Sequence, residues 1–355
     1  MPTQTEVIDA LRKVTDPELG RNLVELNMIH DLAIAQDGSI SFTIALTAPG
    51  CPLRESMAAN ARAVVKALPG VAEVFTGFRE MTGAERSAAL NRAQAPQLPK
   101  LNEFNRIKQV IAVMSGKGGV GKSSITAALA VGLMRRGQKV GILDADITGP
   151  SIPRLFNLPS GGLRASEQGM LPAVTRKGIK VVSTNLLLPE EDLPVVWRGP
   201  MISATIRQFW GEALWGRLDT LLVDLPPGTS DAAIAVVQNL PLKGVVLVTT
   251  PQELAAMVVK KAVRMLTELK VPILGVVENM SYFRCPDNGK EYPIFGPSHA
   301  DEIAAKAGVA VWARLPIDPT LAELFDAGRA EELLTPEFLD LASHLIYSFS
   351  EKEFR

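Results

Sequence analysis

A glycine-rich loop in the middle of the chain constrains its fold more than any other feature of the sequence. The loop, residues 116–123, follows the apolar run 110–114, which predicts a buried strand, and precedes residues 124–136, which predict a helix. Glycines allow backbone N–H groups to approach phosphate oxygens without a Cβ in the way, and the helix N-terminus adds its dipole. A loop of this kind between a strand and a helix is predicted to bind the phosphates of a nucleotide.

The polar residues of this loop have different expected roles. Lys122 is expected to reach the β- and γ-phosphates, and the Ser123 hydroxyl to coordinate Mg²⁺. Lys117 is a second lysine inside the loop, which is unusual and narrows the class of protein. The alternative is a glycine-rich turn without a ligand. It is disfavoured because the motif lies between a predicted strand and a predicted helix, as a phosphate-binding loop does. The expected nucleotide-binding residues are Gly116, Lys117, Gly118, Gly119, Val120, Gly121, Lys122, Ser123 and Ser124.

Beyond the loop, apolar runs alternate with helical patterns to the end of the chain. The runs are rich in Val, Ile and Leu without polar alternation, which is typical of parallel strands buried on both faces. They occupy residues 110–114, 139–143, 180–184, 219–223, 244–249 and 272–277. Helices are predicted at residues 122–136, 201–214, 230–239, 253–269, 299–307 and 336–349. The pattern predicts an α/β fold with a doubly wound, mostly parallel sheet whose ligands bind at the carboxyl ends of the strands.

The first part of the chain predicts a separate, smaller α/β domain. It comprises an amphipathic helix, two strands around the Asp37–Gly38 turn, a helix after residue 52 and a last strand at 71–75. The stretch after it contains prolines and lacks sustained apolar periodicity, so it is predicted to be a linker that can start as a helix. The expected division is a small domain at 1–82, a linker at 83–108 and a large domain at 109–355.

Three aspartates follow predicted strands of the large domain. Asp144 and Asp146 come directly after the strand at 139–143, where a carboxylate can face the γ-phosphate, Mg²⁺ or the attacking water. A plain turn is the alternative for this pair. Asp224 ends another apolar run and is followed by Leu-Pro-Pro-Gly, which is typical of a Walker B aspartate that holds Mg²⁺ directly or through water.

Asn279 stands at the expected end of the strand at 272–277. Its side-chain amide donates and accepts hydrogen bonds at once, which suits the edge of a purine. A structural cap at the end of the strand is the alternative, and the sequence leaves both open.

The chain has two cysteines, Cys51 and Cys285, so no disulfide framework is expected. Cys51 precedes Pro52 at the predicted start of a helix, where the helix dipole favours the thiolate that ligates metal or attacks. A buried inert thiol is the equally supported alternative. Cys285 lies in Cys-Pro-Asp-Asn-Gly, which resembles half of a metal-binding knuckle, but the partner position three residues on is Asn288.

Charge and hydropathy exclude several function classes. The chain of 355 residues has a formal net charge of −1, which argues against a broad nucleic-acid-binding surface. Its N-terminal segment has no apolar signal core, and no apolar run approaches the ~18 residues that span a bilayer. The apolar face of the helix at 336–349 is opposed by acidic and polar residues, so it is expected to dock on the core. We therefore expect a soluble, cytoplasmic protein with no nucleic-acid partner and no stable membrane association.

Several independent motifs together resemble one family. The glycine loop is similar to the deviant Walker A motif of the MinD/ParA/nitrogenase iron protein class. Within this class, the chain resembles the Mrp/ApbC family of ATP-dependent iron-sulfur cluster carriers, and its small domain resembles the iron-sulfur assembly domain that precedes many Mrp proteins. The resemblance covers nearly the whole chain. The matching motifs are 117–123, 144–151, 224–229 and 278–282 in the large domain and 16–18 and 47–52 in the small one.

This resemblance implies an ATPase that uses ATP and Mg²⁺, turns over slowly and works as an ATP-sandwich homodimer. Lys117 would reach the nucleotide of the partner and stabilise transition-state charge, as an arginine finger does, and Asp146 would position or activate the water. Pro316 and Asp318 match a segment that borders the adenine in relatives. The implied cargo is an iron-sulfur cluster of the [4Fe-4S] type, which passes from scaffold proteins to client apoproteins.

One departure from the family pattern bears on the cargo. Most relatives have Cys-x-x-Cys where this chain has Cys285 and Asn288, so a dimer offers two thiols there for a cluster that needs about four. Cys51 from each chain, small thiols or the client are the candidates for the remaining ligands, and a labile, transfer-prone cluster is the hypothesis. The alternative functions are a positioning ATPase of the MinD/ParA kind and a nucleotide-gated scaffold for assembly factors without a stable cluster.

Overall fold

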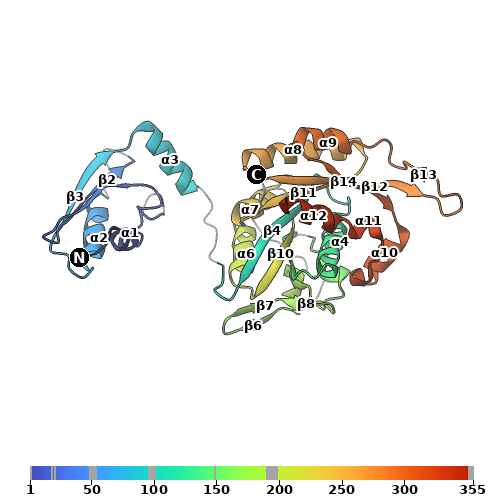
Figure 1. The fold of residues 1–355 in the computed structure, drawn as a ribbon, viewed down its shortest axis with the longest axis horizontal. Helices are drawn as coiled ribbons and strands as arrows, with labels where there is room; N and C mark the ends of the chain where they lie inside the picture. Colours follow the sequence, from blue (N-terminus) through green and yellow to red (C-terminus); the bar gives the residue numbers. More distant parts are fainter. Residues whose placement is uncertain are drawn as a thin grey trace. The chain divides into compact units, whose positions relative to one another are not determined.

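The computed structural model describes most of the chain, which forms two compact units, Met1–Pro96 and Gln97–Arg355 (Figure 1). The described residues are 2–16, 19, 21–47, 54–94, 101–147, 149–188 and 199–350, of which 90–94, 199, 200, 231, 253–257 and 350 are described by their backbone alone.

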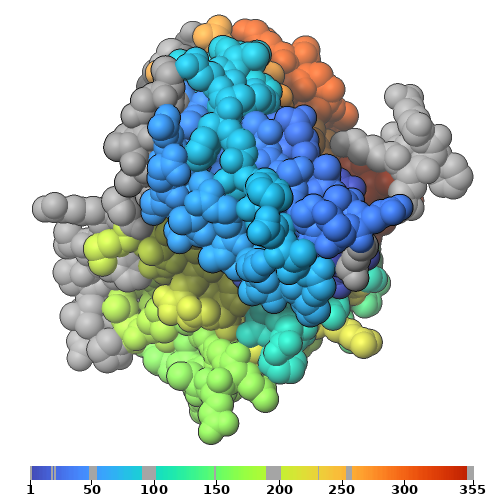
Figure 2. Space-filling view, turned by 90° about the vertical axis from the view of Figure 1, so that its left-hand side faces the viewer, coloured from blue at the N-terminus to red at the C-terminus, as the bar shows by residue number. Residues whose placement is uncertain are grey.

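The small unit packs helices against a sheet of order β1-β2-β3, in which β1 and β2 are antiparallel and β2 and β3 parallel. The last strand lies at 74–80 rather than at the predicted 71–75, because Val74–Glu80 pair in register with the whole of Ile40–Leu46. Figure 2 shows this unit in blue to cyan. Its elements are α1 (Gln4–Leu11), β1 (Ile29–Ile34), β2 (Ile40–Leu46), α2 (Arg54–Lys66) and β3 (Val74–Glu80).

The predicted linker is partly regular structure. Helix α3 (Gly83–Gln94) occupies its first part, and the next strand begins at Arg106, within the predicted 83–108. The helix starts there because Thr82 and Glu85 form a reciprocal cap, in which the Glu85 N–H donates to Thr82 Oγ1 and the Thr82 N–H donates to Glu85 Oε2 at 3.2 and 2.9 Å.

The large unit is built on a mostly parallel sheet, as predicted. Its order within the described residues is β13-β12-β11-β4-β10-β5-β9-β8, with β14 beside β12, and β13 and β8 are antiparallel to their neighbours. The strands are β4 (Arg106–Ser115), β5 (Val140–Asp144), β8 (Ala173–Val174), β9 (Lys180–Val182), β10 (Arg217–Asp224), β11 (Gly244–Thr249), β12 (Ile273–Arg284), β13 (Glu291–Tyr292) and β14 (Val311–Ile317). A separate hairpin contains β6 (Arg164–Ser166) and β7 (Gly169–Leu171).

Helices cover both faces of this sheet because alternate residues of each strand point to opposite sides. In β4, Val110 and Met114 join one hydrophobic core, whereas Ile111 and Val113 join the other. The first core is closed by α6 (Gly199–Gly211), α7 (Asp231–Asn239), α8 (Glu253–Glu268) and α9 (Ala300–Ala307). The second is closed by α4 (Lys122–Arg135), α5 (Ile152–Leu155), α10 (Pro319–Asp326), α11 (Pro336–Leu339) and α12 (Leu341–Ser350).

The C-terminal helical region docks on the second core, as its apolar face predicts. The helix predicted at 336–349 is divided into α11 and α12, and Phe338, Leu341 and Leu345 are fully buried. No helix among the described residues is long and apolar enough to cross a membrane.

Strand β14 contains a bulge at Trp312. Its neighbours Val311 and Ala313 pair with the consecutive residues Val276 and Val277 of β12, so Trp312 is the additional residue. The indole ring covers Gly275, where a Cβ would lie 2.1 Å from Trp312 Nε1.

The carboxyl ends of the central strands meet at one edge of the sheet. Asp224 of β10 pairs with Asp144 of β5 and with Val113 of β4, two residues before the end of β4. The backbone N–H of Ala145 donates to Asp224 O at 2.9 Å and fixes this alignment. The glycine loop and the strand-ending aspartates predicted from the sequence are thereby brought together.

Candidate functional site

The glycine loop links β4 directly to α4, and its backbone conformation requires glycine. Gly119 and Gly121 have φ angles of +79° and +81°, in the left-handed region that disfavours other residues. A Cβ on Gly116 would lie 2.8 Å from the backbone nitrogen of Val259. The loop's N-terminal end is held by Gly228, whose N–H donates to Ser115 O at 2.9 Å.

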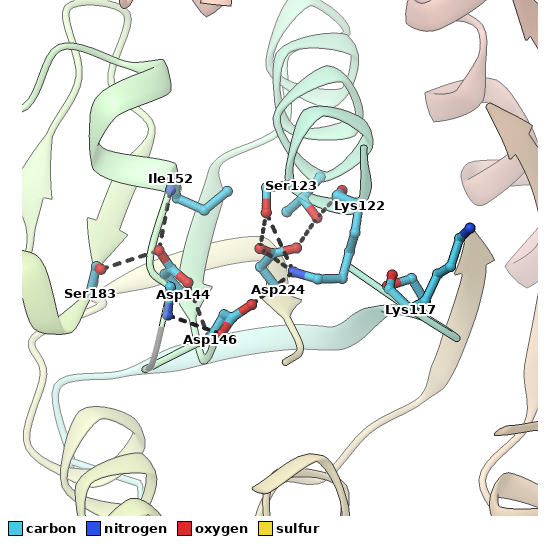
Figure 3. Close-up of polar contacts among 11 residues, drawn as sticks. Lys117, Lys122, Ser123, Asp144, Asp146, Ile152, Ser183 and Asp224 are labelled. Carbon is cyan, nitrogen blue, oxygen red and sulfur yellow. Dashed lines mark hydrogen bonds and ion pairs between the residues drawn. The ribbon is translucent and has the colours of Figure 1, made fainter. Parts of the chain in front are cut away.

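A buried cluster of polar side chains lies at the start of α4 (Figure 3). Lys122 Nζ is 2.6 Å from Asp224 Oδ2, and Ser123 Oγ donates to the same oxygen at 2.6 Å. Thr126 Oγ1 donates to the other carboxylate oxygen at 2.7 Å. Both Lys122 and Asp224 are buried, so the ammonium and the carboxylate compensate each other's charge in an environment of low dielectric.

Asp144 is fully buried beside this cluster. Burial and, after it, the negative charge of Asp224 raise the pKa of its carboxyl to about 8, against the opposing effect of Lys122. Asp144 Oδ2 accepts hydrogen bonds from the Ile152 N–H and from Ser183 Oγ, both at 3.2 Å.

Asp146 faces the same cluster from the loop after β5. Its Oδ2 is 3.9 Å from Lys122 Nζ, and its Oδ1 accepts from the Gly149 N–H at 3.3 Å. The N–H of Asp146 in turn donates to Asp144 Oδ1 at 3.3 Å. The structure therefore brings together Lys122, Ser123, Asp144, Asp146 and Asp224, which the sequence predicted to act at one site.

Lys117 does not belong to this cluster. Its side chain points away from Lys122 and Asp224 (Figure 3), and its ammonium donates to Gln252 Oε1. The two lysines of the loop therefore have different partners. Within this chain, Lys117 is hydrogen-bonded to Gln252, the residue directly before α8.

Asn279 braces the glycine loop. Its Nδ2 donates to Val120 O at 3.0 Å, and a Cβ on Gly121 would lie 2.2 Å from the same nitrogen. The strand does not end near Asn279 as predicted, because β12 continues to Arg284. Met280 has a φ of +54°, and the pairing of β12 with β14 is irregular between Glu278 and Tyr282.

We expect Gly121→Ala to destabilise the protein by about 1–3 kcal/mol, because alanine is strained at positive φ and its methyl group would displace the Asn279 amide. Thermal unfolding without nucleotide measures the effect. Gly118→Ala is the matched control, since among the described residues no atom beyond its chain neighbours lies within 4 Å of a Cβ there. Adding Asn279→Ala should recover the steric part of the loss, and equal stability of Gly121→Ala and wild type would contradict the brace.

The remaining predicted nucleotide contacts lie at the end of β14. Pro316 pairs with Tyr282 of β12. Asp318 caps α10, since its Oδ1 accepts from the Thr320 N–H at 2.9 Å and from the Leu321 N–H at 3.4 Å.

Cys285 opens the turn that follows β12, and it is half-buried. Its N–H donates to Lys290 O and its carbonyl accepts from Gly289 N–H, both at 2.9 Å. At the position of the missing second cysteine, Asn288 Oδ1 accepts from the Lys290 N–H at 2.9 Å, which stabilises the turn.

Cys51 lies outside the described residues, as do Pro17, Glu18, residues 48–50 and Pro52 of the two small-unit motifs. Asp16 is described and buried, and its carboxylate accepts from the Leu19 N–H at 2.9 Å. Among the described residues, no group of three or more His, Cys, Asp or Glu side chains could hold a metal ion.

Several residues that shape the site were not predicted from the sequence. Thr126 stands four positions after Lys122, so helical spacing could have placed it on the same face of α4. Ser183 and Asn185 lie at the short 3-10 helix Thr184–Leu186, and Gln252 lies directly before α8. No motif or other sequence signal joins these residues to the loop.

The donor set fits a magnesium ion. Mg²⁺ prefers hard oxygen ligands and is held at nucleotide sites by one or two protein groups, with phosphates and water completing its shell. The Ser123 hydroxyl and the Asp224 carboxylate are such ligands, 2.6 Å apart. With the glycine loop between β4 and α4, this arrangement defines a nucleotide-binding protein of the P-loop class.

Comparison with known proteins agrees with this class. The family of NUBPL iron-transfer P-loop NTPases matches residues 106–345, and the family of iron-sulfur cluster assembly proteins matches residues 4–75. The chain belongs to the NUBPL iron-transfer P-loop NTPase family, which confirms the resemblance inferred from its motifs.

Individual relatives cover nearly the whole chain. The iron-sulfur cluster carrier protein of Synechocystis sp. is 41% identical over 341 residues, which are 95% of this chain and 93% of that protein. The iron-sulfur cluster carrier protein of Aquifex aeolicus is 38% identical over 341 residues, which are 94% of this chain and 93% of that protein. A solved structure of a nucleotide-binding protein from Archaeoglobus fulgidus in complex with ADP is 48% identical, with a TM-score of 0.59. The match covers 66% of this chain and 91% of that protein's chain.

Proposed function

We propose that the large unit binds Mg²⁺ and ATP and hydrolyses the nucleotide. Lys122 and the backbone N–H groups of the glycine loop bind the phosphates, and Ser123 and Asp224 hold Mg²⁺, which neutralises phosphate charge when bound. Asp146 positions the attacking water. The observation that carries this proposal is the Lys122–Asp224–Ser123 cluster at the end of the glycine loop. Asn279, Pro316 and Asp318 are the candidates for contacts with the base.

In this proposal a homodimer completes the site, and hydrolysis is slow without it. Lys117 points away from the cluster of its own chain and is only half-buried, which leaves it suited to the nucleotide of a second copy. Its hydrogen bond to Gln252 then holds the lysine until the copies meet.

The cargo we propose is an iron-sulfur cluster, which the protein carries in the cytoplasm from scaffold proteins to client apoproteins. The relatives from Synechocystis sp. and Aquifex aeolicus carry the name of iron-sulfur cluster carrier, and the small unit matches the family of assembly proteins. Exposed apolar side chains follow the Cys285 turn and suit a protein partner; they are Tyr292, Ile294 and Phe295.

The thiols available at Cys285 favour a labile cluster. A dimer supplies two thiols there, whereas a [4Fe-4S] cluster takes about four. Asn288 is occupied by its hydrogen bond to the Lys290 N–H and does not replace a thiolate. Cys51, small thiols or the client would supply the other ligands, which makes transfer easy.

Anaerobic reconstitution with iron and sulfide tests the carrier function. We expect wild type to retain cluster iron, Cys285→Ala to lose most of it, and Asn288→Cys to retain more than wild type because each chain gains a second thiolate. Cys51→Ala decides whether that thiol is a ligand. Iron and sulfide are quantified after gel filtration, with and without ATP.

One outcome would overturn this function, and another would overturn the assignment of the cluster to Cys285. Wild type that retains neither iron nor sulfide under any nucleotide condition is not a carrier, and a scaffold role would then be favoured. Equal retention by wild type and Cys285→Ala would place the cargo elsewhere on the chain.

A further inference from the structure

Two polar residues after β9 hold the segment that follows Asp146. Ser183 Oγ donates to Asp144 Oδ2 at 3.2 Å, and that oxygen also accepts the Ile152 N–H at 3.2 Å (Figure 3). Asn185 Nδ2 donates to Pro150 O at 3.3 Å. Residues 150–152 are therefore tied to the segment 183–185 at two points, one direct and one through Asp144.

These ties bear on Asp146 because the same short segment fixes its side chain. Asp146 Oδ1 accepts from the Gly149 N–H, directly before Pro150, and the N–H of Asp146 donates to Asp144. A displacement of residues 149–152 would move the carboxylate that now lies 3.9 Å from Lys122 Nζ.

We propose that Ser183 and Asn185 are positioning residues for hydrolysis, which act through Asp146. The inference rests on the proposed ATPase function. Both side chains are buried, so their hydrogen bonds are shielded from water and are effective in fixing geometry. Their described hydrogen bonds go to Asp144 and Pro150, and not to the glycine loop or Lys122.

The residue between them provides a matched control. Thr184 is buried, and its hydroxyl has no hydrogen-bond partner among the described residues. Thr184→Val keeps the shape of the side chain and removes a hydroxyl that holds nothing, so it should leave hydrolysis unchanged. Ser183→Ala and Asn185→Asp remove donors that do hold the segment, with little change in volume.

The experiment compares single-turnover ATP hydrolysis and ADP affinity in full-length variants. We expect Ser183→Ala with Asn185→Asp to lower the hydrolysis rate by about 10- to 100-fold, since misplacing a catalytic group by about 1 Å has an effect of this size. The Kd for ADP should stay within about twofold of wild type, because the groups that bind phosphate are untouched. Thermal unfolding establishes that each variant is folded. If the double variant is not folded, the single variant Asn185→Asp replaces it in the comparison.

A background of Asp146→Asn separates positioning from general support of the fold. If the two residues act through Asp146, adding their substitutions to Asp146→Asn should produce no further loss of rate. A full additional loss, or a rate of the double variant equal to wild type, overturns the inference. Absence of hydrolysis by wild type would instead refute the proposed ATPase function, so the two failures are distinguishable.

Discussion

Replacing Lys117 with alanine should leave nucleotide binding nearly intact and reduce ATP hydrolysis about a thousandfold, the lower range for loss of a charge supplied in trans. The physical reason is the direction of its side chain, which points away from the Lys122–Asp224 cluster and donates a hydrogen bond to Gln252. ADP affinity by calorimetry and phosphate release measure the two effects. Gln252→Ala is the control, since it frees Lys117 without removing its charge and should not slow hydrolysis.

Mixing two inactive variants tests whether Lys117 acts across a dimer. The Lys117→Ala variant binds nucleotide but lacks the ammonium that acts in trans. The Lys122→Ala variant supplies Lys117 to its partner but does not bind nucleotide. Mixed dimers then contain one complete site, and hydrolysis should reappear. Hydrolysis by Lys117→Ala at the wild-type rate would rule out the trans role, and a mixture as inactive as its components would argue for action within one chain.

Lys122→Ala should abolish both nucleotide binding and hydrolysis and should also destabilise the protein. Lys122 Nζ lies 2.6 Å from the fully buried Asp224, and removing one member of a buried pair destabilises by about 3–5 kcal/mol. The remaining carboxylate would be buried without its cation. Denaturant unfolding without nucleotide measures this loss independently of ATP.

A lysine in an exposed ion pair is the control for this stability effect. Lys260 Nζ is 2.8 Å from Glu302 Oε1 on the surface, where such pairs contribute about 0–1 kcal/mol. Lys260→Ala should therefore change stability little. If Lys122→Ala is as stable as Lys260→Ala, then Asp224 is not held as an ion in the folded protein, and the electrostatic account of the cluster is wrong.

The fold of the large unit could be predicted because its central strands are apolar on both faces. Runs such as 244–249 have no polar alternation, and only a sheet covered by helices on both sides buries them. Short elements such as α5 escaped prediction, since four residues are too few to show a helical period.

Strand β12 was underestimated for a different reason. The polar residues after Val277 suggest an end of the strand, yet Glu278 is fully buried and accepts hydrogen bonds from Ser281 Oγ and Ser298 Oγ at 2.5 and 2.9 Å. Such polar residues continue a strand only because distant partners satisfy them, and a single sequence does not reveal those partners.

The candidate site was predictable where topology alone determines it. Parallel strands end at one edge of the sheet, so Asp144, Asp224 and the glycine loop had to converge. The contacts of Asn279 with Val120 and of Lys117 with Gln252 depend on how loops pack across the sheet. They involve single polar residues without a pattern, and the structure was needed to find them.

The bulge at Trp312 has a consequence for how this fold tolerates variation. Because the indole ring fills the space over Gly275, a larger residue at position 275 requires a smaller residue at position 312. The same fit prevents β14 from sliding along β12, since a slipped strand would drive the ring into a neighbour that has a side chain. One glycine outside the glycine loop thereby constrains where Pro316 and Asp318 lie at the edge of the sheet.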